Sequence, residues 1–188
     1  MIRQATFPLL FALSPALHPD PSAVLERRVR RSLLRREPVV VGTLAAPYEP
    51  AGSSESPLRL LLAVEGMEIG ITTASPRISR ELELLVELDR RHSVSVRMAV
   101  SVPSRPDTMA RLGAVRSLAA DGITTRLHVA PAAGARAADL RALLAEAREA
   151  GVYDVELEDD LQNQRSLLAA FWSLRLEHGF PRDVPGRG

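Results

Sequence analysis

The segment Val94-Ser95-Val96-Arg97-Met98-Ala99-Val100-Ser101-Val102 alternates large apolar residues with polar or small ones. This period of two is typical of a β-strand that has one apolar face and one polar face. Helical patterns flank the segment on both sides, over residues 76–91 and 107–120. Helices on both sides of a strand indicate repeated βα units, and therefore a parallel sheet in an α/β protein.

The rest of the chain repeats this arrangement. Further strands are predicted at residues 39–44, 67–75, 123–130 and 153–158, and further helices at 20–36, 57–65, 137–150 and 161–178. Strands of an open sheet that is covered by helices on both faces should be apolar on both sides. Four of the strands instead alternate, so we expect a barrel or part-barrel with a polar-lined interior. A sheet with one face in solvent is the alternative.

The chain divides into a short arm, one domain and a tail. Residues 1–18 are predicted to form an N-terminal strand or arm, residues 19–180 the part-barrel, and residues 181–188 a polar tail. The apolar start is short and is interrupted by Pro8, which argues against a secretory signal and favours a cytoplasmic protein. No run of 18 apolar residues is present, so no membrane-spanning segment is expected.

Composition excludes several kinds of chemistry. The 188 residues contain no cysteine, which excludes disulfides, a thiolate nucleophile and a cysteine-ligated metal site or cluster. All 24 basic residues are arginine, so a lysine Schiff base and a P-loop are excluded too. The net charge of +1 argues against a dedicated nucleic-acid or membrane-surface protein. We interpret the missing lysine as codon usage in a GC-rich genome, because alanine and arginine are abundant as well.

Ligands of parallel βα proteins bind at the carboxyl ends of the strands. His128 lies at such an end on the polar face, where an imidazole can act as an acid or a base near neutral pH. Glu156 is its candidate catalytic partner; the alternative for His128 is a hydrogen-bonded lining residue. The carboxylates Glu156, Glu158, Asp159 and Asp160 could hold a hard cation. In the alternative, which we favour, Glu156 pairs with Arg97 or Arg126, the Asp pair caps the next helix, and no metal is bound.

The first predicted helix is rich in arginine. Four of its arginines form a candidate phosphate-binding stripe for a nucleic acid: Arg27, Arg28, Arg30 and Arg31. No aromatic residues are interleaved with them for base stacking, which favours a solvated helix face instead. That face would pack through Val24, Val29, Leu33 and Leu34. The remaining histidines, His18, His92 and His178, fall at element edges and are predicted to lie on the surface.

Three segments together resemble one family. Residues 41–50, Val-Gly-Thr-Leu-Ala-Ala-Pro-Tyr-Glu-Pro, resemble the GT-x-TDPYQP segment of radical SAM proteins related to spore photoproduct lyase. Residues 71–76, Ile-Thr-Thr-Ala-Ser-Pro, followed by Arg-Glu-Leu-Glu-Leu-Leu at 80–85, are similar to that group's ITKS strand–helix junction. Leu-Ala-Ala-Asp-Gly-Ile at 118–123, with Val-Ala-Pro at 129–131 and Gly134, resembles its next strand. The resemblance covers residues 20–160 in order.

The resemblance implies a fold and a ligand. The family's fold is a partial TIM-barrel-like sheet of six βα units, and its enzymes cleave S-adenosylmethionine on a [4Fe–4S] cluster that is held by three cysteines spaced CxxxCxxC. This chain cannot supply those thiolates. Ala46 stands where the family has Asp, and Ala74 stands where it has Lys. Cofactor-binding positions would map onto Thr43, Pro47, Tyr48, Glu49, Thr72, Thr73, Ser75 and Ser101.

These observations give one leading hypothesis and three alternatives. The leading hypothesis is a degenerate radical SAM-like protein, in effect a pseudoenzyme, that binds a small molecule in the barrel mouth or pairs with a protein partner. A partner subunit or a second copy of the chain would then cover the sheet edges. The first alternative is an active radical SAM enzyme whose cysteine motif lies upstream of a mis-annotated start. The second is a cofactor-free hydrolase or isomerase that uses His128 and Glu156. The third is a DNA-binding module that uses the arginine-rich helix.

Overall fold

The structure is a computed structural model of the 188-residue chain, and it describes residues 26–27, 29–32, 34, 38–45, 47–50, 56–103, 106–158 and 165–180. The chain divides into two compact units, residues 1–95 and 96–188, and the boundary falls inside the third strand. The predicted arm at 1–18 and the predicted tail at 181–188 lie outside the described residues.

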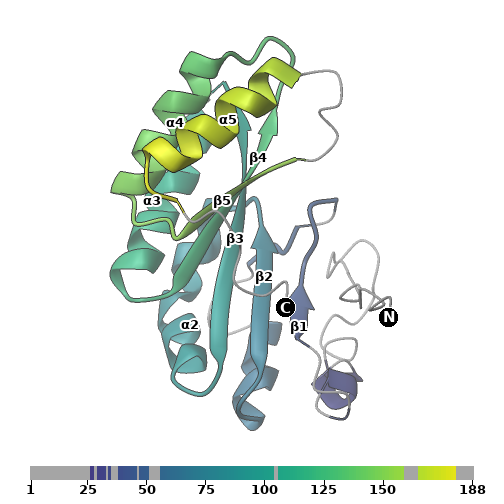
Figure 1. Ribbon diagram of the computed structural model, residues 1–188. Coiled ribbons are helices and arrows are strands. Elements are labelled where there is room, and N and C mark those ends of the chain that lie inside the picture. Colours follow the sequence, from purple (N-terminus) through teal and green to yellow (C-terminus); the bar gives the residue numbers. More distant parts are fainter. Residues whose placement is uncertain are drawn as a thin grey trace. The chain divides into compact units, whose positions relative to one another are not determined.

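The N-terminal unit contains two strands and the helices that follow them. Strand β1 (Val39–Val41) pairs in parallel with β2 (Glu68–Thr73), with Val40 opposite Gly70 (Figure 1). The 3-10 helix η1 (Pro57–Ala63) comes between them, and the 3-10 helix η2 (Pro76–Glu81) leads into α2 (Leu82–Asp89). The two segments that we predicted as single α-helices, 57–65 and 76–91, are therefore wholly or partly 3-10.

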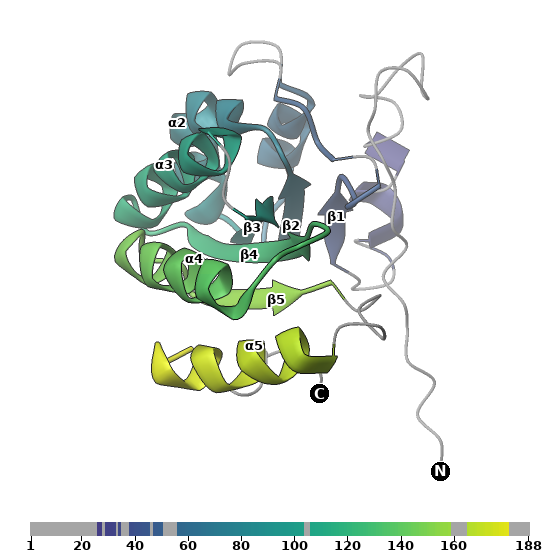
Figure 2. The same cartoon turned by 90° about the horizontal axis from the view of Figure 1, so that it is seen from above.

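The C-terminal unit contains most of the regular structure. Strand β3 (Ser93–Val102) enters it, followed by α3 (Pro106–Ala120), β4 (Thr124–Pro131), α4 (Ala137–Glu149), β5 (Asp154–Leu157) and α5 (Arg165–Glu177). Helix α3 contacts both β4 and α4, while α5 contacts α4 and β5 (Figure 2). Strands β4 and β5 pair in parallel, with Arg126 opposite Asp154 and His128 opposite Glu156.

The protein is therefore α/β, with a five-stranded parallel sheet whose strand order, β1-β2-β3-β4-β5, follows the chain. The alternation that led to the prediction is present in β3, where every second residue from Val94 to Val102 is buried and the residues between them are half-buried. Each unit has a buried apolar core, which includes Ile69 and Leu85 in the first unit and Met98, Leu127 and Phe171 in the second, all at most 1% exposed. No helix among the described residues is long and apolar enough to cross a membrane.

Candidate functional site

The carboxyl ends of β1 and β2 meet at a close backbone approach. Gly42 has a φ of +79°, and a Cβ built on it would lie 2.3 Å from the carbonyl oxygen of Thr72 and 2.5 Å from the amide nitrogen of Tyr48. The Tyr48 N–H donates to that same Thr72 carbonyl at 2.8 Å, and the Thr73 hydroxyl donates to the Tyr48 carbonyl at 2.6 Å. Only glycine fits at position 42, because any side chain would occupy the space that the returning chain needs.

Tyr48 is used inside the unit rather than presented to a ligand. The side chain is 1% exposed, and its hydroxyl donates to both carboxylate oxygens of the buried Glu81 at 3.1 Å. The Ser56 hydroxyl lies 3.0 Å from it and also accepts from the Leu58 amide at the start of η1. Burial raises the pKa of the Tyr48 hydroxyl, and the Glu81 charge raises it further although the Ser56 hydrogen bond opposes the shift.

The structure places most of the other predicted cofactor-binding residues around this junction. Thr72 and Ser75 are buried, yet among the described residues neither hydroxyl oxygen has a hydrogen-bond partner. The Thr73 hydroxyl is occupied, since it also accepts from the Ser75 amide at 3.0 Å. Three predicted residues lie nearer the surface: Thr43 and Pro47 are half-buried, and Glu49 is exposed. Within the described ranges, Thr72 and Ser75 therefore have unused hydroxyl groups beside the junction, and Glu49 has an exposed carboxylate.

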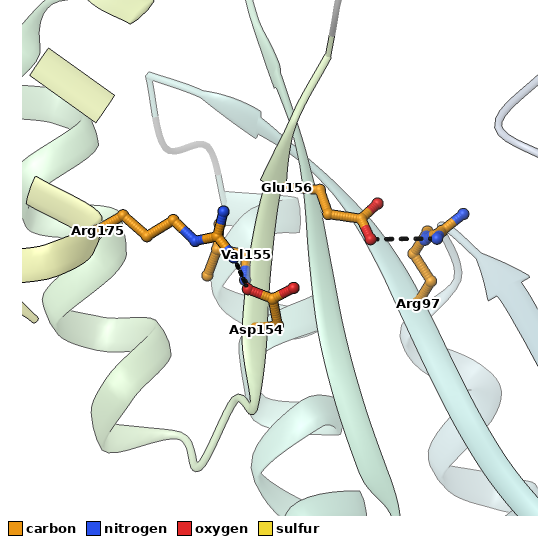
Figure 3. A network of polar contacts seen from close by, with 5 residues as sticks. All are labelled: Arg97, Asp154, Val155, Glu156 and Arg175. Carbon is orange, nitrogen blue, oxygen red and sulfur yellow. Dashed lines mark hydrogen bonds and ion pairs between the residues drawn. The ribbon is translucent and has the colours of Figure 1, made fainter. Parts of the chain in front are cut away.

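A second set of polar side chains lies in the C-terminal unit. We define the polar face of this unit by Arg97 on β3, Arg126 and His128 on β4, and Asp154 and Glu156 on β5. Arg97 Nη2 lies 3.2 Å from Glu156 Oε1, so of the two partners expected for this glutamate, Arg97 and Arg126, the structure shows Arg97 (Figure 3). Ser101, the predicted cofactor residue on β3, is half-buried, and its carbonyl accepts from the Thr108 hydroxyl at 3.3 Å.

Asp154 forms a buried ion pair that the sequence analysis did not predict. Its Oδ1 accepts from Arg175 Nη2 of α5 at 2.6 Å and from the Val155 amide at 2.8 Å (Figure 3). The side chains of Asp154 and Arg175 are 0% and 4% exposed. The pair ties α5 to the strand that begins at Asp154. No sequence spacing points to it, because the partners come from separate elements.

His128 and Glu156 are neighbours on adjacent strands, as the catalytic hypothesis requires. They are register partners, and His128 is buried. Glu156 also forms the ion pair with Arg97. Of the predicted acidic cluster, Glu158 is exposed, while Asp159 and Asp160 lie outside the described residues. No group of three His, Cys, Asp or Glu that could hold a metal occurs within the described ranges.

The arginine-rich segment is helical at each of its described positions, 26–27, 29–32 and 34. Arg27, Arg30 and Arg31 are exposed, and Arg30 pairs with Glu26 at 2.7 Å; Arg28 lies outside the described residues. Val29 is buried, as we expected for the packing side of this helix. The expectation for Leu34 was wrong, because its side chain is 88% exposed.

His92 is the clearest error among the surface predictions. Its side chain is 7% exposed; Nδ1 accepts from the Met67 amide at 3.2 Å, and Nε2 lies 3.0 Å from the Leu61 carbonyl. His178 is half-buried and His18 lies outside the described residues. His92 joins η1 to the start of β2, so a position at an element edge did not mean solvent exposure.

An open pocket of about 640 Å³ lies at the amino end of β5, opposite to the strand ends where the sequence analysis placed a ligand. It is lined by Arg148, Gly151, Val152, Tyr153 and Gly179. The strand predicted at 153–158 starts one residue later than expected, since β5 begins at Asp154, and Tyr153 is 44% exposed.

Comparison with known proteins finds relatives in mycobacteria. A 123-residue segment is 29% identical to uncharacterized proteins of Mycobacterium bovis and of two strains of Mycobacterium tuberculosis. The match covers 58% of this chain and 36% of each relative, so the chain spans about a third of the length of these proteins. No family model matches the chain.

Proposed function

We propose that this chain is a radical SAM-like part-barrel that lacks cluster ligands of its own, and that it binds a small polar ligand at the carboxyl ends of β1 and β2. The observation that carries the proposal is the junction of Gly42, Tyr48 and Thr72. Two of the three segments that resemble the radical SAM family are residues 41–50 and 71–76. They come from separate parts of the chain and are hydrogen bonded to each other at this junction. In parallel βα proteins such strand ends are where ligands bind.

The residues present fit one of the family's two cofactors and not the other. A [4Fe–4S] cluster needs thiolates, and the 188 residues contain none. S-adenosylmethionine needs hydrogen-bonding groups, and the hydroxyls of Thr72 and Ser75 and the carboxylate of Glu49 provide them at the junction. In this proposal the chain's own role is to bind and orient the ligand, and it performs no cleavage by itself.

Calorimetric titration of the purified chain with S-adenosylmethionine tests the proposal. We expect saturable binding that weakens by about tenfold in Thr72→Val, because that change removes one hydroxyl and keeps the side-chain shape. Thr124→Val is the matched control, since Thr124 is exposed at the start of β4 and should leave binding unchanged. Absence of binding to the folded chain, or equal binding by Thr72→Val, would contradict the proposal.

A second candidate is an active enzyme whose thiolates come from outside these residues. The length of the mycobacterial relatives favours it, because the matched segment covers only 36% of them and a longer protein has room for a cysteine-bearing segment. The genomic DNA next to the coding region provides the test. An in-frame CxxxCxxC motif upstream would support this candidate, and an upstream sequence without one would leave only thiolates supplied by a partner subunit.

A further inference from the structure

Among the described residues, Arg126 is the charged side chain of the polar face for which the structure gives no balancing partner. Arg97 pairs with Glu156 at 3.2 Å, and Asp154 pairs with Arg175 at 2.6 Å (Figure 3). Arg126 lies on the same face, opposite Asp154 in the strand register. Within the part of the chain that the structure describes, it has neither a hydrogen-bond partner nor an ion-pair partner.

The surroundings of Arg126 set it apart from the other arginines without partners. Those in the described residues, namely Arg31, Arg77, Arg80, Arg90 and Arg116, are exposed and solvated. Arg126 is half-buried, and its Nε is completely shielded from solvent without a hydrogen bond. Burying part of a guanidinium without a partner is unfavourable, because the lost hydration is not replaced. A bound anion would replace it.

The charge of the face indicates what kind of anion fits. Arg97 pairs with Glu156 and Arg175 pairs with Asp154, so each of these ion pairs is neutral by itself and neither balances the single positive charge of Arg126. A single carboxylate cancels that charge, and its two oxygens match the planar fork of donors on a guanidinium. We propose that Arg126 binds the carboxylate of a small organic acid on this face. This site does not rest on the proposed function.

Arg126 itself provides the signal with which to test the site. Its shielded Nε–H should exchange slowly and give a side-chain ¹⁵N–¹H resonance, which Arg126→Gln identifies by its loss. Titration with sodium acetate at constant ionic strength should shift this resonance along a saturable curve, whereas sodium chloride should not. The affinity for acetate, followed on backbone amides of β4, should fall by about tenfold or more in Arg126→Gln. Arg116→Gln, on α3, should bind acetate like the unaltered chain.

Two outcomes would overturn the proposal. One is a response that does not saturate with acetate, or that saturates only with inorganic phosphate. The other concerns stability, because Asp154 Oδ2 is also buried without a partner and Arg126 is its nearest neighbour in the register. If Arg126 serves to neutralise Asp154, Arg126→Gln will lower the melting temperature of the unliganded protein. A ligand-binding Arg126 should leave that temperature unchanged or raise it.

Discussion

The two units use buried polar side chains in opposite ways. In the N-terminal unit, the Tyr48 hydroxyl is hydrogen bonded to Ser56 and to the buried carboxylate of Glu81, and the Thr73 hydroxyl donates to the Tyr48 carbonyl, so hydroxyl groups support a buried charge and close a turn against the strand ends. In the C-terminal unit, Asp154 and Arg175 use full charges to tie a helix to a strand. A hydroxyl both donates and accepts hydrogen bonds, so Tyr48 contacts the Glu81 carboxylate without adding a second charge, whereas Asp154 contacts a full counter-charge on Arg175. Losing one partner of the charged pair should therefore cost more than losing the hydroxyl.

Breaking the buried ion pair should have the largest effect. Asp154→Ala leaves Arg175 buried without its counter-charge and should lower the free energy of unfolding by about 3–5 kcal/mol. Urea denaturation measures the loss. The comparison variant is Arg97→Gln, whose pair with Glu156 is 35% and 25% exposed and should contribute about 1 kcal/mol or less. Equal losses in the two variants would show that the burial of the Asp154–Arg175 pair has no energetic consequence.

Filling the space at Gly42 should have the next largest effect. Gly42→Ala places a Cβ against Thr72 and Tyr48 in addition to straining a positive φ, and should cost about 2–4 kcal/mol. Gly66→Ala is the matched control: its φ is +72° and nothing lies within 4 Å of an added Cβ, so the cost should be about 1 kcal/mol. The difference in melting temperature between the two variants measures the cost of the close contact between position 42 and its neighbours, because both variants share the strain of a positive φ. Equal costs would mean that the 42–48 segment can move away from β2.

Removing the Tyr48 hydroxyl should have the smallest effect and also change the pH dependence. Tyr48→Phe loses the hydrogen bonds to Ser56 and Glu81 and should cost about 1–3 kcal/mol at neutral pH. Because the pKa of Tyr48 is raised in the folded protein, its contribution is complete below the ordinary tyrosine pKa of about 10 and is lost as the pH rises above it. Stability should therefore fall above pH 10 in the unaltered chain and fall less in Tyr48→Phe.

The composition of the chain makes this measurement unusually clean. The sequence has no lysine and no cysteine, so tyrosines are the side chains that titrate near pH 10, and there are only two of them. Tyr153→Phe is the control, because that side chain is 44% exposed and should leave the alkaline loss in place. An alkaline loss that disappears with Tyr153 instead of Tyr48 would contradict the assignment.

Much of the fold could be predicted because its signals are local. All five described strands fall where alternation or a short apolar run placed them, and their ends differ by at most three residues. The helices at 57–65 and 76–91 were less accurate, since Pro57 and Pro76 each start a 3-10 turn that periodicity does not distinguish from an α-helix. The closure of the sheet into a part-barrel remains a proposal.

The site residues show where local signals end. The family resemblance selected both Tyr48 and Thr72, which the structure joins by a hydrogen bond, but it could not tell that the Tyr48 hydroxyl is turned toward Glu81, 33 residues further along the chain. Likewise, His92 was assigned to the surface because it falls between two elements, whereas Leu61 and Met67 enclose it. Burial depends on what packs against a residue, and that information lies elsewhere in the chain.

Composition by itself determined that this chain has no thiolate and no lysine amine, since the chemistry of a side chain does not depend on the fold. The alternation in residues 94–102 likewise determined a strand with two unlike faces, because backbone geometry fixes a period of two. Only the tertiary structure decided which charges on the polar face are balanced. Ion pairing requires two charges within a few ångströms of each other, and such distances exist only after the elements have packed. In the packed unit, Asp154 pairs with Arg175 and Glu156 pairs with Arg97. Arg126, opposite Asp154 in the strand register, is left without an ion pair among the described residues.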